Sequence, residues 1–540
     1  MKKFILLFLI VIVIFLYTRP FFHSGFITTH DGEWSIVRLS EMYRELKDGQ
    51  FPPRWSDYLN HGYGYPLFLF TYPMPFYLGL IFKLAGFGFI SSIKILFVVS
   101  VLVSGLAMFE LGRELIDDYA GLLSSIFYIT VPYRLVDLYV RGSIGESLGF
   151  ALLPLLFLLA LRFIRRPTSF SFSLLCLALA SLVLIHNVTA ILFFPVFLGF
   201  FIAVTFIQKK HNFIFSIKYL ILIILVSLGL SAYFFIPALV EKKYLVLSTM
   251  KLADVSENFI RITDYLNSQW SYGSKPSVRL GETLIISSLI SLSLGLVLGN
   301  KVKNKFFPLL LFILMSLGFI IFFSNSASKI FWQFPPLSWI DFPWRLTLIL
   351  VFLLSFSTIF LALNKYSKTI GIILVLFAIF GNLNFVNPSG YIDKEDAYYL
   401  TNDATTTSKD ELMPVWVVDK PKNRFQKKVE ILEGLAQVRD LQYNSKQINF
   451  QLDLFSDSLV KINTVYFPGW QITASSKIIP ISYHNSNGTI QFWLNSGTYT
   501  IRGNFRETPI RYYSNLLSII SLLFLALINI VSLKYKKIFS

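Results

Sequence analysis

Cysteine is almost absent from this chain, and histidine is sparse. The only cysteine, Cys176, lies inside an apolar segment, which leaves no basis for a disulfide framework or a thiolate metal site. The six histidines are scattered along 540 residues, and none shows the spacing of a helical zinc pair. No Gly-rich nucleotide loop, Ser-His-Asp signature or nucleic-acid motif is present.

Acidic residues are also few, and apolar residues dominate. The chain has 31 Asp and Glu against 48 Lys and Arg, a net charge of +17, and 54% hydrophobic residues. Repeated apolar runs near twenty residues predict a polytopic α-helical membrane protein. The basic residues gather in short loops between these runs, so the charge indicates membrane topology and anionic lipid as a neighbour, not nucleic acid.

The basic loops predict which ends of the apolar segments face the cytoplasm. They follow the predicted spans 147–164, 187–207, 282–299, 345–363 and 514–533, and the spans 169–185, 213–237, 306–323 and 369–386 alternate with them. Phe4–Tyr17 follows a Met-Lys-Lys start, and no small-residue cleavage site comes after it. We therefore expect an uncleaved first span that begins in the cytoplasm.

Three apolar segments lie between the first span and the span 147–164: 66–86, 89–111 and 119–132. Because the outer ends of these two spans both face outward, an even number of crossings must separate them. The first of the three segments carries Pro66, Pro73 and Pro75, so we expect it to dip into the membrane and return, buried against protein. The prediction is about twelve crossings, with the N- and C-termini in the cytoplasm.

The first outer loop, 18–65, is polar and aromatic. His30 and Asp31 precede a predicted amphipathic helix that ends near Asp48-Gly49. Asp31 is also a good residue to cap this helix, so a capping role is an alternative to a chemical one. The apolar face of the helix would consist of Ile36, Leu39, Tyr43 and Leu46.

Further polar groups fall at the same predicted outer end of the spans, outside the cytoplasm. Arg141 and Glu146 lie five residues apart, His186 is followed by Asn187, and Asp341 precedes Arg345. The alternative readings are ordinary interfacial anchoring for Arg345, a helix-end role for His186, and a Glu in a first helical turn for Glu146. Few charges interrupt the spans, which argues against a charge relay of the transporter type.

The composition changes after Phe385. Residues 387–510 are mostly polar, with alternating stretches at Val460–Tyr466 and Thr489–Leu494 and a hairpin turn at Asn487-Gly488. We predict three parts: a transmembrane module at 1–386 with outer loops 18–65, 238–281 and 324–344, a β-sandwich-like domain at 387–510, and a final helix with a basic tail at 511–540.

These features resemble the GT-C superfamily of multispanning glycosyltransferases. The resemblance depends on Asp31 in the first outer loop, the amphipathic helix after it, and the terminal β domain. More narrowly, the chain is similar to uncharacterised bacterial membrane proteins labelled "6-pyruvoyl-tetrahydropterin synthase-related". The matching stretches are YVRGSIGESLGFALLPLLF at 139–157, DFPWRL at 341–346 and YFPGW at 466–470.

The resemblance implies sugar transfer from a polyprenyl-phosphate donor on the outer face of a bacterial inner membrane. Asp31 and Glu146 would be catalytic, with Asp31 as the base. The substrate-binding residues would be His30, Arg141, His186, Asp341 and Arg345. No cofactor is assigned, and because no DxD motif is present a divalent metal stays an open alternative.

Two other functions stay open. The first is a non-catalytic or glycan-exporting envelope protein, whose β domain would make the contacts. The second is a glycan polymerase or ligase with a lipid-diphosphate donor. The oligomeric state, the sugar and the acceptor are not legible in the sequence.

Overall fold

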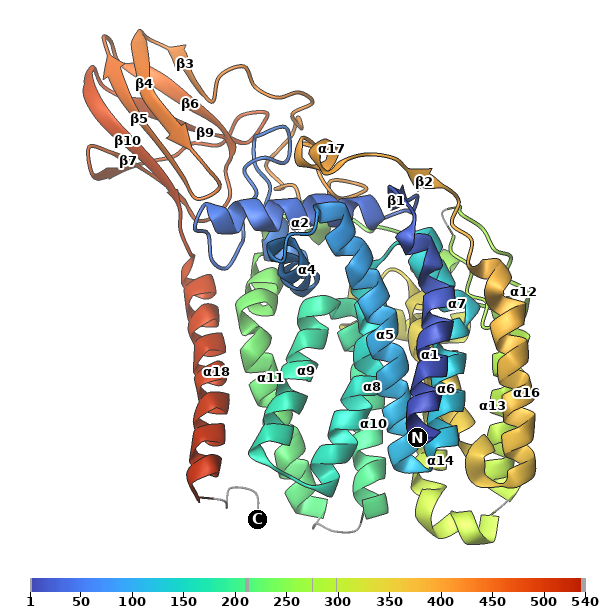
Figure 1. Cartoon of the computed structure of the whole chain (residues 1–540). Coiled ribbons are helices and arrows are strands. Elements are labelled where there is room, and N and C mark those ends of the chain that lie inside the picture. Colours follow the sequence, from blue (N-terminus) through green and yellow to red (C-terminus); the bar gives the residue numbers. More distant parts are fainter. Residues whose placement is uncertain (1, 209–212, 274, 298, 536–540) are drawn as a thin grey trace.

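The computed structural model describes residues 2–208, 213–273, 275–297 and 299–535. A bundle of long helices carries a β domain at one end, and the first helix begins and the last helix ends toward the other end (Figure 1). The helices are α1 Lys2–Thr18, α2 Gly32–Lys47, α3 Leu67–Phe70, α4 Met74–Leu84, α5 Phe89–Leu115, α6 Asp118–Thr130, α7 Pro132–Val136, α8 Ile144–Arg165, α9 Ser169–Ile185, α10 Asn187–Gln208, α11 Phe213–Glu241, α12 Asp264–Asn267, α13 Glu282–Val297, α14 Gly299–Ser324, α15 Thr347–Ser357, α16 Lys365–Asn382, α17 Asp396–Leu400 and α18 Pro509–Tyr535.

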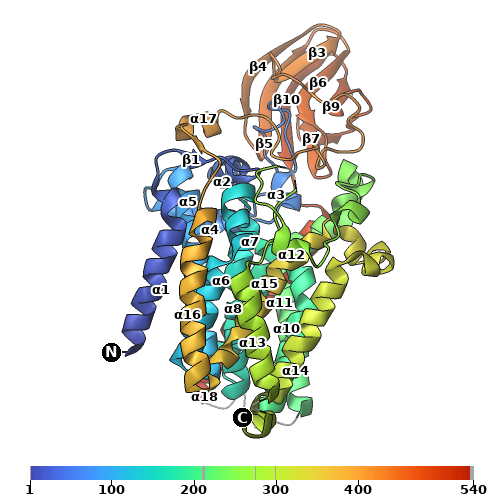
Figure 2. The same ribbon diagram turned by 90° about the vertical axis from the view of Figure 1, so that its right-hand side faces the viewer.

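Among the described residues, nine helical segments are long and apolar enough to cross a membrane. The chain is therefore a multi-pass membrane protein. The predicted count of about twelve crossings also needs the shorter helices α6, α9 and α13, which run alongside the long ones (Figures 1 and 2). Because a span needs about 20 residues and these three have 13, 17 and 16, the count stays a prediction.

The segment 66–86, predicted to dip and return, forms two short helices. They are α3, with four residues, and α4, with eleven. α4 packs against α2 at the β-domain end of the bundle, where a Cβ on Gly79 would lie 3.1 Å from Leu39. Eleven residues cover about 16 Å at the helical rise, roughly half of a bilayer core.

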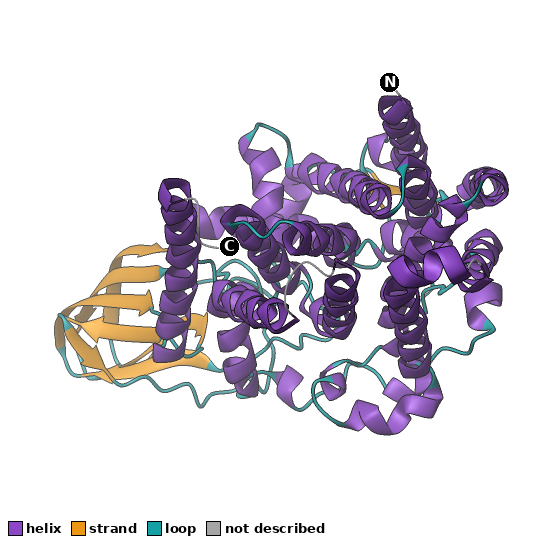
Figure 3. Cartoon of the chain, turned by 90° about the horizontal axis from the view of Figure 1, so that it is seen from below, coloured by secondary structure: helices purple, strands orange, loops and turns teal. Residues whose placement is uncertain are grey.

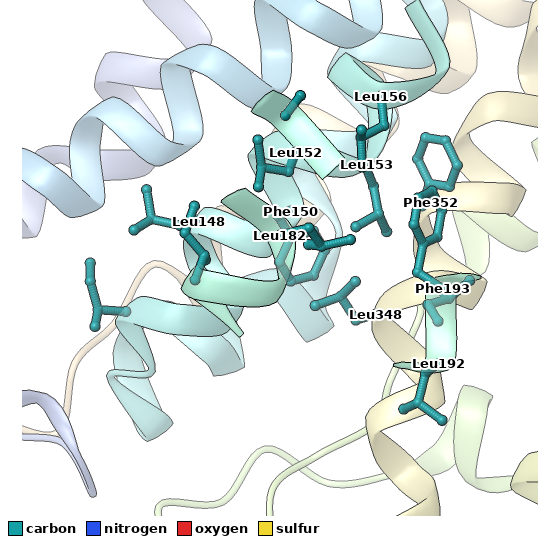
Figure 4. Packing of buried hydrophobic residues seen from close by; sticks show 14 of the residues in the cluster. Leu148, Phe150, Leu152, Leu153, Leu156, Leu182, Leu192, Phe193, Leu348 and Phe352 are labelled. Carbon is teal, nitrogen blue, oxygen red and sulfur yellow. The ribbon is translucent and has the colours of Figure 1, made fainter. Parts of the chain in front are cut away.

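The helices differ strongly in how far they are enclosed by protein. The apolar stretch of α8 is 89% buried, whereas that of α18 is only 6% buried. α18 and α1 stand at the edge of the bundle, so their apolar side chains are free to face lipid (Figure 1). The enclosed core combines leucine and phenylalanine side chains from α8, α9, α10 and α15 (Figure 4), including Leu148, Phe150, Leu153, Leu182, Phe193 and Phe352.

α2 has the predicted amphipathic pattern, and Ile36 and Leu39 are fully buried. Its polar side is covered as well, by the segment that leads into the β domain. Tyr399 donates its hydroxyl to Glu33 at 3.0 Å, and Arg38 Nε donates to Thr406 at 3.2 Å. α2 is therefore held between two layers of protein.

The β domain is a sandwich of two antiparallel sheets. One sheet has the order β4-β5-β10-β7-β8 and the other β3-β6-β9. The predicted stretch Thr489–Leu494 coincides with β9. The predicted stretch Val460–Tyr466 overlaps β6, which begins two residues earlier and ends one residue earlier. The strands are β1 Phe26–Ile27, β2 Tyr391–Ile392, β3 Val429–Glu433, β4 Ala436–Tyr443, β5 Gln447–Leu454, β6 Ser458–Val465, β7 Trp470–Ala474, β8 Lys477–Ile479, β9 Thr489–Leu494 and β10 Gly497–Phe505.

The β domain lies over one edge of the bundle, as the view along the helices shows (Figure 3). The loop after α2 attaches it. Trp55 is buried against Trp470, with ring centroids 6.1 Å apart, and Lys428 donates to the carbonyl of Gly62 at 3.0 Å. Arg54 donates to the Tyr233 carbonyl of α11 at 2.8 Å. Aromatic packing and hydrogen bonds from one loop therefore set the position of the domain.

A second connection joins the first loop to the linker that precedes the β domain. β1 and β2 pair antiparallel, with Phe26 opposite Ile392 and Ile27 opposite Tyr391. The Thr28 amide also donates to the Gly390 carbonyl at 3.0 Å. The loop that contains His30 and Asp31 is therefore tied to the segment that follows the helical module in the sequence.

The ends of the helices are consistent with the predicted grouping of basic residues. α8 ends at Arg165 and α16 begins at Lys365, both at the end of the bundle remote from the β domain (Figure 1). Other residues of the basic loops lie outside the described residues (Lys209, Lys210, Lys536 and Lys537).

Candidate functional site

The site begins with an irregular turn between α7 and α8. Pro132 starts α7, and the chain then forms a π-helical turn at Asp137–Arg141 that ends at Gly142. Gly142 has φ +63°, a left-handed conformation that glycine adopts without strain. This reversal places Asp137, Arg141 and Glu146 around one point at the start of α8.

These three residues form a buried ion-pair network. Arg141 donates to Glu146 with both terminal nitrogens, through Nη2 at 2.8 Å and through a shorter Nη1 contact. Arg141 Nη1 also lies 3.0 Å from Asp137 Oδ1, and Ser147 donates to the other Asp137 oxygen at 2.9 Å. Because the guanidinium is buried and bound at both ends, Arg141 is engaged by protein and has little capacity left for a ligand.

The first outer loop is attached directly to this turn. The His30 amide donates to the Val140 carbonyl at 3.0 Å, and the Asp31 amide donates to the Arg141 carbonyl at 2.9 Å. The fit is close, since a Cβ on Gly142 would lie 2.3 Å from Thr29 Oγ1. Two backbone hydrogen bonds therefore place Asp31 beside the network, although 110 positions separate it from Arg141 along the chain.

Asp31 occupies the N-cap position of α2, but its side chain makes no capping hydrogen bond. Thr29 accepts from the Gly32 amide at 3.1 Å instead. The Asp31 side chain is half-buried, and it lies within electrostatic reach of Tyr72, as Glu146 and Arg345 also do. Asp31 therefore takes the N-cap position with its backbone only, and Thr29 provides the side-chain hydrogen bond. The Asp31 carboxylate is not used to cap the helix.

Arg345 supplies a second guanidinium next to the network. Its Nε lies 3.7 Å from Glu146 Oε1 and has no hydrogen-bond partner among the described residues. The side chain is 24% exposed, and its guanidinium carbon lies 5.8 Å from the centre of the Trp344 ring. Trp344 also contacts Arg141, with 4.7 Å from its ring centre to the guanidinium carbon. Arg345 therefore combines a fixed position with donor capacity that is not used by protein.

His186 lies near the same carboxylate oxygen of Glu146 as Arg345 does. Its Nε2 lies 4.0 Å from Glu146 Oε1, and its Nδ1 is 2.7 Å from Thr189 Oγ1. The helix-end role expected from sequence is present too, since the His186 amide donates to the Leu182 carbonyl at 3.0 Å. Tyr72 packs edge-on against the imidazole, with ring centroids 5.4 Å apart.

Two predicted residues lie apart from the network. His30 is exposed, and its Nε2 is 3.0 Å from the Tyr272 carbonyl. Asp341 accepts from the Leu252 amide at 3.1 Å, and among the described residues no ion pair joins it to Arg345. The side chains of His30 and Asp341 therefore hold the surrounding loops.

Tyr72 and Asp137 are the main residues that the sequence predictions missed. Asp137 stands four positions before Arg141, a spacing that places two residues on the same helical face and could have revealed it. Tyr72 has no such signal, because its place depends on the fold of the segment 66–86. It fits over Gly145, where a Cβ would lie 2.8 Å from the Tyr72 ring.

The residues described here contain no group of three or more His, Cys, Asp or Glu side chains that could hold a metal ion. The carboxylates of Asp137 and Glu146 are occupied by Arg141.

No protein-family model matches the sequence. A curated relative, an uncharacterised protein of Lactococcus lactis, is 26% identical over 243 residues. This match covers 44% of the present chain and 39% of the relative, so it spans about two fifths of that protein.

Solved structures that are similar to this chain include an arabinofuranosyltransferase and an oligosaccharyltransferase. The mycobacterial arabinofuranosyltransferase AftD has a TM-score of 0.46 at 16% identity, over 74% of this chain and 28% of AftD. The oligosaccharyltransferase of Archaeoglobus fulgidus has a TM-score of 0.41 at 14% identity, over 74% of this chain and 56% of that enzyme. A second structure of it, with an inhibitory peptide and a dolichol-phosphate, has a TM-score of 0.40 at 13% identity, over 76% and 57%.

Proposed function

We propose that this protein transfers a sugar from a polyprenyl-phosphate donor to an acceptor hydroxyl at the outer face of a bacterial inner membrane. The observation that carries the proposal is the pair of backbone hydrogen bonds from His30 and Asp31 to the turn at Val140 and Arg141. They hold Asp31, whose side chain makes no capping hydrogen bond, next to the turn of the ion-pair network, and Arg345, whose Nε has no hydrogen-bond partner among the described residues, lies at Glu146 of the same network.

The reaction would be a single displacement. The acceptor oxygen forms a bond to the anomeric carbon, the bond from that carbon to the phosphate oxygen breaks, and the polyprenyl phosphate leaves. Asp31 takes the proton of the acceptor hydroxyl. Arg345 donates to the phosphate oxygens and offsets the charge that develops there, for which a guanidinium has suitable geometry.

The paired residues would have a positioning role. Arg141 is bound by Glu146 and Asp137, so its charge stabilises these carboxylates and fixes the turn that carries Asp31. Glu146 lies close enough to Arg345 and His186 to orient both. This assignment differs from the sequence-based one, in which Arg141 bound phosphate and Glu146 was catalytic, because both side chains are enclosed.

The proposed sidedness follows from the basic loops. If α8 and α16 meet the cytoplasm at Arg165 and Lys365, then the opposite ends of the helices, with Asp31 and the β domain, face outward. The N- and C-termini would then be cytoplasmic, in agreement with the expected topology.

The test uses the purified full chain in lipid nanodiscs with radiolabelled polyprenyl-phosphate sugars and a pool of glycan acceptors. Asp31→Asn is expected to lower turnover by about 10²–10⁴-fold, the usual contribution of a general base. Glu33→Gln is the matched control, since it removes a carboxylate from the same helix that is bound to Tyr399. We expect this control to retain turnover within a few-fold.

The outcomes separate the open alternatives. Equal turnover by wild type and Asp31→Asn would remove Asp31 as the base. Turnover with lipid-diphosphate sugars alone would favour a polymerase or ligase. Failure of both donor classes, with a folded protein, would favour the non-catalytic envelope role.

A further inference from the structure

The segment that follows α14 displays large apolar side chains to the outside. It contains a 3-10 helix at Ser326–Gln333 and a second short one at Leu337–Trp339. Phe334 is 61% exposed, Trp339 50%, and Ile330 62%, and two consecutive prolines at 335 and 336 lie among them. We call residues 326–339 the aromatic loop. A water-exposed loop of this composition would be costly, because each large apolar side chain favours burial.

The aromatic loop is an ordered platform. Trp332 points inward, where its indole nitrogen donates to the Phe323 carbonyl at 3.1 Å and its ring packs edge-on against Phe259 at 6.0 Å. Asn325 caps the helix by accepting from the Ala327 amide at 3.1 Å. With Trp332 fixed inside, the neighbouring Ile330 and Phe334 are held outward.

The exposed surface continues that of a membrane span. Phe331 contacts Phe322 of α14, with ring centroids 5.9 Å apart, and Phe322 is itself exposed on the span Phe306–Ser324. The loop also ends at a span, Pro343–Leu363. Both of its ends are thus tied to helices that meet the membrane. In Figure 2 the chain after α14 projects sideways from the upper part of the bundle.

The charge around the aromatic loop suits a lipid interface. Lys329 and Lys251 are exposed, and both lie within electrostatic reach of Asp254. Lysine next to exposed aromatic residues is typical of the level of lipid headgroups, where the stem contacts apolar chains and the ammonium contacts phosphate. Tryptophan is also enriched at this level, in agreement with Trp339.

We propose that the aromatic loop inserts into the membrane leaflet at the β-domain end of the bundle. Ile330, Phe331 and Phe334 contact acyl chains, and Trp339 lies at the headgroup level. The outer loop expected from sequence at 324–344 thus contains an interfacial element, next to the turn that carries Arg345. This inference does not depend on sugar transfer.

The experiment measures the depth of nitroxide labels on the full chain in nanodiscs of phosphatidylethanolamine and phosphatidylglycerol. Labels are attached to Phe334→Cys and, separately, Ile330→Cys, in a Cys176→Ala background. Cys176, which is buried, is the single cysteine of the chain. Its replacement therefore leaves the introduced thiol as the one target for the label. The matched control is Phe455→Cys, an equally exposed phenylalanine at 70% that lies between β5 and β6 in the β domain.

The label at 334 or 330 is expected to collide with oxygen severalfold more often, relative to a water-soluble nickel complex, than the label at 455. Ratios equal to that of the control would overturn the proposal. Dipolar broadening that disappears when labelled protein is diluted with unlabelled protein would overturn it too, since it would assign the surface to a second copy of the chain.

Discussion

Glu146 and Glu45 are both almost completely buried, at 1% and 0% exposure, but their surroundings are opposite. Glu146 receives two hydrogen bonds from Arg141 and lies near two further basic groups. Neither carboxyl oxygen of Glu45 has a hydrogen-bond partner among the described residues. Glu45 lies instead under the loop that attaches the β domain, with Glu41 and Asp57 nearby.

The difference separates two uses of a buried acid. Burial of a charge is tolerated when a guanidinium compensates it, as at Glu146. Without such a partner the neutral form is favoured, and burial, aided by the neighbouring acids Glu41 and Asp57, raises the pKa of Glu45 well above its usual value. The turn at Asp137–Arg141 therefore contains compensated charges, whereas burial under the loop that attaches the β domain favours a neutral acid.

The largest predicted effect comes from Glu146→Gln. The substitution leaves the buried Arg141 with one carboxylate instead of two, and loss of a partner in such a pair costs about 3–5 kcal/mol. We expect a markedly lower thermal midpoint in detergent, measured by intrinsic fluorescence. The matched control is Glu45→Gln, the same change at an equally buried residue without an Arg partner, which should raise the midpoint at pH 6, because folding no longer requires uptake of a proton at this position. Equal losses in the two variants would refute the distinction between them.

Gly142→Ala tests the turn that joins the charged network to Asp31. A left-handed conformation at a residue other than glycine costs about 1–3 kcal/mol, and the added Cβ would meet Thr29 as well. The thermal midpoint and sugar transfer should both fall. Gly86→Ala is the control, because Gly86 is also left-handed, at φ +100°, but has nothing within 4 Å of its Cβ position. If both variants behaved alike, the contact with Thr29 would be irrelevant.

The smallest predicted effect is a pH dependence of stability, which comes from the buried acids under the loop that attaches the β domain. Burial raises the pKa of Glu41 from 4.5 to about 7, and burial also raises the pKa of Glu45 well above its usual value. Between these values the unfolded chain has released protons that the folded chain keeps, so stability falls as pH rises from about 5 to 7. Each such group contributes about 1.4 kcal/mol per pH unit in this window.

Glu45→Gln should therefore make this fall less steep, which thermal midpoints at pH 5, 6 and 7 would show. Burial lowers the pKa of Lys428 to about 7, and this acts in the opposite sense, but only above pH 7, where stability gains as pH rises toward 10.5. An unchanged slope in the variant would mean that Glu45 is ionised in the folded protein.

Much of the fold could be predicted because hydrophobic patterns are local. The predicted span 169–185 coincides with α9, and the alternation at Thr489–Leu494 coincides with β9. The YFPGW stretch at 466–470 forms a turn with a buried tryptophan, in which the Trp470 amide donates to the Phe467 carbonyl at 3.2 Å.

The predicted site residues are only partly brought together, because their contacts depend on distant segments. Arg141, Glu146, His186 and Arg345 converge, whereas Asp341 binds the Leu252 backbone. The burial of Glu41 and Glu45 could not be predicted from the pattern of α2, which places them on its polar side. They are covered by the loop after α2, and a helical pattern contains no information about what packs on it.

The pairing of β1 with β2 has a consequence for biogenesis. The loop with Asp31 is synthesised early, but the strand that holds its first residues, Tyr391–Ile392, is synthesised only after α16. In a ribosome-bound chain that stops before this strand, the loop would lack the pairing of β1 with β2. If the protein transfers sugars as proposed, this activity would arise late, once the helical module is inserted, and incomplete translation products would be inactive.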